Sequence, residues 1–210
     1  MPRITLNIFD VTLFRALALA TLLSFMAFTP VSAQDWNKGV DAYQAGDYAT
    51  ALQEWRPLAD QGDADAQYFL GVMYEKGNGV PQNYAEAVKW FRLAADQGDA
   101  DAQYNLGVMY EKGYGVPQNY AEAVKWFRLS AKQGDAQAQN SLAVRYEYGE
   151  GVLQNNIMAH MWYNLAAANG HEKAGEWRDE RAGLMTNADI SKAQAMAREC
   201  MSSGYTKCGY

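Results

Sequence analysis

The 210-residue sequence contains few of the residue types from which enzyme active sites and metal centres are usually built. It has two histidines and two cysteines, and neither histidine recurs at an equivalent position elsewhere in the chain. The motifs S-x-x-K, G-x-S-x-G and H-E-x-x-H, which position nucleophiles or zinc ligands in hydrolases, are absent. We therefore predict no catalytic residue, no cofactor and no metal site.

Positive charge is also scarce. The chain has 18 Lys and Arg residues against 24 Asp and Glu residues, which gives a formal net charge of −6. Nucleic-acid binding requires a basic face that releases phosphate counterions, and attachment to anionic lipid requires a polybasic segment. The charge balance excludes both of these partner classes, and the partner that we predict is another protein or a peptide.

Only one long apolar run occurs, at residues 16–28 near the N-terminus. Its 13 residues fall short of the ~20 that are needed to span a membrane. Arg3 and Arg15 precede the run, and the small residues of segment 31–33 follow it, which is the layout of a cleavable signal peptide. We predict that residues 1–33 are removed after Ala33. The mature chain would then be periplasmic or secreted, without stable membrane insertion.

The only cysteines, Cys200 and Cys208, lie close to the C-terminus. In an exported chain, an isolated pair this close in sequence indicates a disulfide. A metal or redox site is the alternative, but no histidine is near and the C-x-x-C spacing of redox pairs is absent. We predict a structural disulfide that ties down the C-terminal tail.

The main positive feature of the sequence is a 36-residue repeat. Residues 63–98 and 99–134 differ at only four of 36 positions, and residues 135–170 are a diverged third copy. A fixed period of this length is typical of stacked repeat proteins, in which one unit cannot bury its apolar side chains alone. The repeat therefore determines the predicted architecture.

Each unit is predicted to form two antiparallel helices. Gly77 is expected to end the first helix in the left-handed conformation, and Pro81 delays the start of the second. The pairs Asp63/Asp65 and Asp99/Asp101 lie at helix starts and are predicted to cap helices, with calcium binding as the weaker alternative. The large aromatic side chains recur at helical spacing, which favours core packing over an aromatic ligand-binding site. The apolar stripes of the first unit are Ala66, Leu70 and Tyr74, then Ala87, Trp90, Phe91, Ala94 and Ala95.

The two ends depart from the repeat. Residues 34–62 are predicted to form a compressed helix pair, and residues 171–210 a polar helix followed by a closing helix that Thr186 caps. In the third unit Ala143 replaces a glycine and Leu153 replaces the proline, so we expect an altered turn there. The total is about ten helices in five pairs.

Two consecutive motifs resemble those of a known family. A-x-x-x-L-G-x-x-Y-x-x-G-x-G-V occurs at residues 66–80 and 102–116, and Y-x-x-A-x-x-W-F-x-x-A-A-x-x-G at residues 84–98. They resemble the Sel1-like repeat, a relative of the tetratricopeptide repeat. The resemblance implies an all-α, right-handed solenoid of antiparallel helix pairs that serves as an adaptor for other proteins. Cysteine-rich secreted members bind or slowly hydrolyse β-lactams, but they carry a cysteine pair in nearly every repeat, unlike this chain.

His160 is the remaining candidate for chemistry within the repeats. It occupies the position of Val124 in the preceding unit, 36 residues earlier. A histidine that replaces a valine at one copy of a repeat is more often a tolerated surface or packing residue than a ligand. We assign it no function.

Partner binding is predicted on the first helices of the units, which line the concave face in solenoids of this type. Two columns of residues are expected to face away from the Leu70 stripe, although they could simply be solvated. Position 69 differs between two nearly identical units, which suggests freedom from core constraints, and Met is adaptable at binding surfaces. The candidate residues are Phe69, Met73, Asn105, Met109, Ser141 and Arg145.

The predicted function is that of a non-catalytic, exported scaffold that binds another protein through this concave face. Two alternatives stay open at this point. One is a β-lactam-binding or β-lactam-hydrolysing enzyme of the cysteine-rich type, and the other is a binder of peptides or cell-wall fragments.

Overall fold

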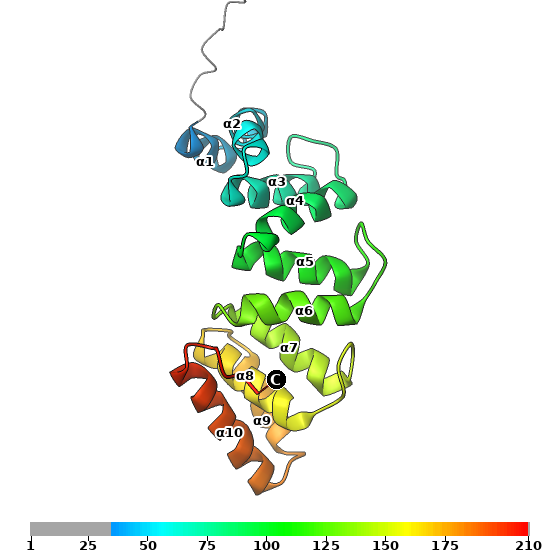
Figure 1. The fold of residues 1–210 in the computed structure, drawn as a ribbon, viewed down its shortest axis with the longest axis vertical. Coiled ribbons are helices and arrows are strands. Elements are labelled where there is room, and N and C mark those ends of the chain that lie inside the picture. The colour runs from blue at the N-terminus through cyan, green and yellow to red at the C-terminus, as the bar shows by residue number, and fades with distance from the viewer. Residues whose placement is uncertain (1–34, 210) are drawn as a thin grey trace, which may run out of the picture. The chain divides into compact units, whose positions relative to one another are not determined.

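The computed structural model describes residues 35–209, which fold into ten α-helices and contain no strand (Figure 1). The predicted signal peptide and its cleavage point after Ala33 lie outside the described residues, as do Gln34 and Tyr210. Within the described part of the chain, no helix combines the length and apolarity required to cross a membrane.

The helices pack in chain order. Each contacts the next up to α9, and α10 returns to contact α8. The predicted all-α solenoid of helix pairs is therefore confirmed. In order along the chain, the helices are α1 (Trp36–Gln44), α2 (Tyr48–Asp60), α3 (Ala64–Lys76), α4 (Tyr84–Asp96), α5 (Ala100–Lys112), α6 (Tyr120–Ala131), α7 (Ala136–Tyr148), α8 (Asn156–Ala168), α9 (Ala174–Ala182) and α10 (Asn187–Ser202).

The first helix of each repeat begins at an aspartate and ends at a glycine. The carboxylates of Asp63 and Asp99 accept hydrogen bonds of 2.8 and 2.6 Å from the backbone N–H three residues further on. Both side chains are therefore N-caps, as predicted. Gly77 follows α3 with φ of 73°, in the left-handed region that glycine tolerates without a steric penalty.

The expected distortion of the third turn is absent. Gly149 has φ of 71°, close to the 73° of Gly77, and the side chain of Gln154 donates a 2.9 Å hydrogen bond to the carbonyl of Glu147. Equivalent bonds close the two earlier turns. Leu153 is 90% exposed, so the side chain that replaces proline is free of packing constraints. The conformation of this turn is therefore maintained by its glycines and its glutamine, and it does not require the proline.

Close packing within a helix pair depends on one glycine. A Cβ atom added to Gly71 would lie 2.5 Å from the ring of Phe91, and one added to Gly107 would lie 2.6 Å from Phe127. Both rings are fully buried. The aromatic ring of the second helix therefore lies directly on the backbone of the first, in the space that a side chain would occupy.

A ladder of amides connects consecutive units through the core. Its buried members, Gln67, Gln103 and Gln139, each donate to a backbone carbonyl at the end of the preceding second helix, at 3.0 to 3.1 Å. The side-chain oxygen of each accepts a bond of 2.8 or 2.9 Å from an amide that follows the unit's own second helix. These buried amides are thus bonded at both ends, which avoids the free-energy cost of unpaired polar groups.

A second ladder pairs arginine with tyrosine. Arg56 of α2 donates a 3.1 Å hydrogen bond to the hydroxyl of Tyr74 in α3, and Arg128 of α6 donates a 2.8 Å bond to Tyr146 in α7. Arg92 and Tyr110 form the equivalent pair. Each guanidinium carbon also lies 5.7 to 6.0 Å from the centre of its partner's ring, within the range of cation–π attraction.

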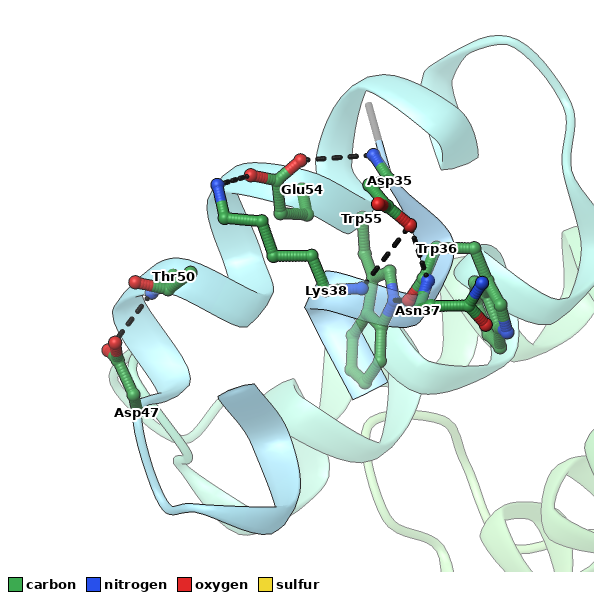
Figure 2. A network of polar contacts seen from close by, with 8 residues as sticks. All are labelled: Asp35, Trp36, Asn37, Lys38, Asp47, Thr50, Glu54 and Trp55. Atoms are coloured by element: carbon green, nitrogen blue, oxygen red, sulfur yellow. Dashed lines mark hydrogen bonds and ion pairs between the residues drawn. The ribbon is translucent and has the colours of Figure 1, made fainter. Parts of the chain in front are cut away.

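A buried carboxylate connects the two helices of the first pair. Glu54, only 5% exposed, accepts hydrogen bonds from the side chain of Lys38 and from the backbone N–H of Asp35 (Figure 2). The bond from Lys38 is the main reason that the pKa of Glu54 lies below its ordinary value. Asp35 and Asp47 in turn cap α1 and α2, so polar contacts fix both helix starts.

The predicted disulfide between Cys200 and Cys208 is present, with Cα atoms 4.5 Å apart and both residues buried. It attaches the tail to α10, which Thr186 caps as expected. The hydroxyl of Tyr205 in this tail donates a 2.9 Å hydrogen bond to Asn169, the last amide of the ladder. The disulfide therefore holds the tail where it completes the ladder.

His160 is a core residue of α8. It is 2% exposed, and its Nδ1 atom has no hydrogen-bond partner among residues 35–209. Burial, aided by the positive charge of Arg178, lowers the pKa of His160 below 6.5. The folded state therefore favours the neutral imidazole.

Substitution of Gly71 by Ala should lower the free energy of unfolding by about 1–3 kcal/mol, because the new methyl group would overlap the ring of Phe91. Gly175→Ala is the matched control, since its Cβ would meet nothing closer than 3.9 Å and alanine favours helix. Urea denaturation should show destabilisation only for Gly71→Ala. Equal stability of the two variants would contradict the proposed contact.

Replacement of His160 by Val should reduce the sensitivity of the fold to acid. Because the folded pKa lies below the unfolded value, stability is complete above about pH 6.5 and falls by up to about 1.4 kcal/mol per pH unit below it. Thermal melting at pH 7.5 and pH 5.5 should therefore show a smaller loss of Tm in His160→Val than in the unmodified protein. His171→Val controls for the mere removal of a histidine, and equal losses in all three proteins would refute the assignment.

Candidate functional site

The methionines predicted to bind a partner are core residues. Met73 and Met109 are both 0% exposed, so their assignment to an accessible surface is wrong. Met73 lies three residues after Leu70, which places both side chains on the same side of α3. It packs in one cluster with Trp55 of the preceding helix, and Met109 packs in the next cluster with Phe91.

Arg145, the third member of that column, is also buried, at 8% exposure. Its guanidinium forms a 2.5 Å ion pair with Glu150 and lies 5.1 Å from the ring centre of Tyr120. The assignment of Arg145 to an accessible surface is therefore wrong as well. The arginine links α7 to the start of α6.

The other column is half-buried and has partners within the chain. Phe69 packs against the aromatic residues of the first helix pair, with its ring centre 4.8 Å from that of Trp55. Asn105 and Ser141 are hydrogen-bond partners of Tyr68 and Tyr104, the tyrosines of the preceding unit. Phe69 thus packs against the aromatic first pair, whereas Asn105 bonds to a tyrosine. These different neighbours explain why the two near-identical repeats differ at this position. Partner binding by this column stays a prediction.

A different set of residues recurs along one side of the first helices. Most of its members keep accessible surface, but Val72 and Glu147 are buried, at 7% and 9% exposure. In α3, α5 and α7 the set occupies positions i, i+3, i+7 and i+10, which lie within an arc of roughly 80° at 3.6 residues per turn. We refer to it as the Asp–Tyr–Val–Glu face. Its members are Asp65, Tyr68, Val72 and Glu75 in α3, Asp101, Tyr104, Val108 and Glu111 in α5, and Gln137, Asn140, Val144 and Glu147 in α7.

Tyrosines join this face across units. Burial raises the pKa of Tyr68, and the nearby carboxylate of Asp101 in α5 raises it further. Tyr104 is affected in the same way by burial and by Asp135 at the start of α7. Both rings are half-buried, so part of each remains accessible beside these acidic groups.

The glutamates of the face differ in how their charge is balanced. Burial raises the pKa of Glu75, and no ion pair joins its side chain to another residue of the described chain. Glu111 pairs with its neighbour Lys112 at 2.8 Å. Glu147 is the most buried, and pairs with Arg181 of α9. The negative charge is thus least compensated in the first unit.

A pocket of about 300 Å³ lies where the face meets α8 and α9. The hydroxyl of Tyr163 donates a 2.7 Å hydrogen bond to Glu147 at its base, and the ring centres of Tyr163 and Trp177 are 6.0 Å apart. Burial and the carboxylate of Glu147 raise the pKa of Tyr163 far above its ordinary value, so the hydroxyl keeps its proton. The lining residues are Val144, Glu147, Tyr148, Tyr163, Trp177, Glu180 and Arg181.

A second pocket, of about 450 Å³, lies on α8 and α10 beside the tail. Its lining combines the cationic residues Arg128 and Lys192 with apolar side chains that include Leu153 and Met196. The two pockets therefore differ in the charge that their linings carry.

Position 65 of this face was among the positions expected to lie opposite the Leu70 stripe, whereas Tyr68, Val72 and Glu75 were not. The four face positions recur at 36-residue intervals, and the first two copies are identical in residue type. Their i, i+3, i+7, i+10 spacing was an available signal. Met73 was expected to lie opposite the Leu70 stripe, but both residues belong to the same buried side of α3.

Comparisons with known proteins agree with this architecture. The Sel1 repeat matches residues 64–99, 100–135 and 136–171, each one residue later than the units defined from the sequence period. None of the curated proteins matches the sequence.

Two crystal structures are similar to this chain. A Sel1 repeat protein from Oxalobacter formigenes is 30% identical with a TM-score of 0.68, and the match covers 81% of this chain and 78% of that one. A protective antigen present in uropathogenic Escherichia coli strains, which displays an SLR fold, is 38% identical with a TM-score of 0.65. That match covers 78% of this chain but only 37% of the antigen.

Proposed function

Because the chain belongs to the Sel1 repeat family, we propose that it is a non-catalytic scaffold that binds another protein through the Asp–Tyr–Val–Glu face. The observation that carries the proposal is the accessible part of the repeat. Glycines, caps and buried ladders account for much of what recurs in the core. They do not account for exposed aspartates and half-buried tyrosines and glutamates at matching positions on α3 and α5.

The composition of the face favours a basic partner segment. Asp65 and Asp101 are exposed, and Tyr68 and Tyr104 beside them offer ring surface as well as a hydroxyl group. Tyrosine is enriched at protein interfaces because it combines apolar area with a polar end. The net charge of −6 acts in the same direction, since complementary charge steers association and selects among partners.

We also propose that the protein acts outside the cytoplasm, in the periplasm or after secretion. The disulfide between Cys200 and Cys208 supports this location, because such bonds persist in oxidising compartments. The signal-peptide layout of residues 1–33 is independent support from the sequence.

The proposal predicts that charge reversal on the face abolishes partner capture. The double variant Asp65→Lys/Asp101→Lys should recover at least about tenfold less partner than the unmodified protein, because both exposed carboxylates are lost and repulsion is introduced. The measurement is quantitative mass spectrometry of cross-linked material that the purified chain recovers from envelope extract. Circular dichroism checks that the variant keeps its helices.

The matched control is Asp60→Lys/Asp96→Lys. These two aspartates are exposed, occupy equivalent positions at the ends of α2 and α4, and change the net charge by the same amount. The control should recover the partner as the unmodified chain does. Equal recovery by the face variant would rule out this face, and recovery of no specific protein by the unmodified chain would rule out the scaffold. Hydrolysis of a chromogenic β-lactam would contradict the absence of catalysis.

A further inference from the structure

We propose that the pocket between α7, α8 and α9 binds one cationic side chain, a lysine or arginine of the partner segment. The inference rests on the proposed function and makes it more specific. The pocket shares Val144 and Glu147 with the Asp–Tyr–Val–Glu face, so a segment that lies along the face reaches it. A volume of about 300 Å³ is at the lower limit for ligand pockets and suits one side chain better than a whole small molecule.

Three aromatic rings provide the first part of the recognition. Tyr148 is 65% exposed at the mouth of the pocket, Trp177 is half-buried, and Tyr163 is buried beside it. The negative faces of such rings attract ammonium and guanidinium groups, and the attraction strengthens as water is excluded. A cation in this pocket gains contacts that a neutral side chain of equal length lacks.

The charges that line the pocket favour a cation over an anion. Arg181 forms an ion pair with Glu147, which also accepts a hydrogen bond from Tyr163, so the arginine already has a carboxylate partner. Glu180 is exposed and forms no ion pair among residues 35–209. With two carboxylates and one guanidinium, the lining carries one net negative charge.

The third unit departs from the first two at the residues that form the pocket. Tyr148 stands where the earlier units have Lys76 and Lys112, and Lys112 pairs with the glutamate of its own unit. Tyr163 stands in place of Phe127 and supplies the hydroxyl that bonds to Glu147. The third unit thus lacks the chain's own lysine and has aromatic and hydroxyl groups instead, and it is where the pocket forms.

The test is a titration of the disulfide-bonded protein with a short, N-acetylated and C-amidated peptide that carries a single lysine among glycine and serine residues. Two-dimensional NMR follows the indole N–H signal of Trp177, assigned by comparison with Trp177→Phe. We expect this signal to shift and saturate with the lysine peptide. The same peptide with norleucine or glutamate in place of lysine should leave it unchanged.

The decisive variant is Tyr148→Lys, which restores the residue type of the other units at an exposed position. It should weaken binding of the lysine peptide at least about tenfold, through loss of a ring and repulsion by the added charge. Leu153→Lys is the matched control, since it adds the same charge at a residue that is 90% exposed and outside this pocket. It should bind as the unmodified protein does.

Three results would overturn the inference. They are an equal shift with the norleucine or glutamate peptide, unchanged binding by Tyr148→Lys, and no saturable shift with the lysine peptide. The partner-capture experiment separates this inference from the proposed function. If Asp65→Lys/Asp101→Lys loses the partner while Tyr148→Lys keeps it, the scaffold stands and the pocket assignment fails. If the lysine peptide binds the pocket but the face variant still captures the partner, the pocket assignment stands and the assignment of partner binding to the face fails.

Discussion

The contact between a helix backbone and an aromatic ring sets the geometry on which the other contacts depend. At Gly71 and Gly107 the missing side chain leaves room for Phe91 and Phe127, so the two helices of a pair pack ring against backbone. A flat ring that fills this space leaves the opposite side of the first helix free to pack against the preceding unit. Leu70 and Met73 are buried there, in a cluster with residues of α2. One small residue per unit thus allows both sides of the first helix to be buried.

Polar ladders then fix how consecutive units are aligned. Apolar side chains alone would tolerate small shifts between helices, whereas a buried amide requires a partner at one position. Gln67 and Gln103 meet that requirement twice each, and Arg56 bonds to Tyr74 on the same principle. These interactions are internal and explain why much of the sequence recurs. They do not explain the residues that recur on the exposed side of α3 and α5, which are Asp65 with Asp101 and Tyr68 with Tyr104.

The C-terminal helices and tail cover the end of the solenoid, and the helices also form a pocket. The disulfide holds the tail so that Tyr205 completes the amide ladder at Asn169, and α9 places Arg181 on Glu147. A terminal unit must cover the stripe that a following repeat would bury. Here the covering helix also brings Trp177 beside Tyr163, and so forms the pocket. The helix that covers the end of the solenoid therefore also contributes residues to the pocket proposed for a cationic side chain.

The sequence by itself determined the all-helical architecture, the helix starts at aspartate, the turns at glycine and the disulfide. Each of these depends on local backbone chemistry or on a period that is visible in one dimension. The tertiary structure decided which side of each first helix is accessible. Helical spacing gives the angle between two side chains of one helix, but only packing between units decides which arc the preceding helix covers. Met73 and Arg145 are buried for this reason, whereas Tyr68 and Glu75 keep accessible surface.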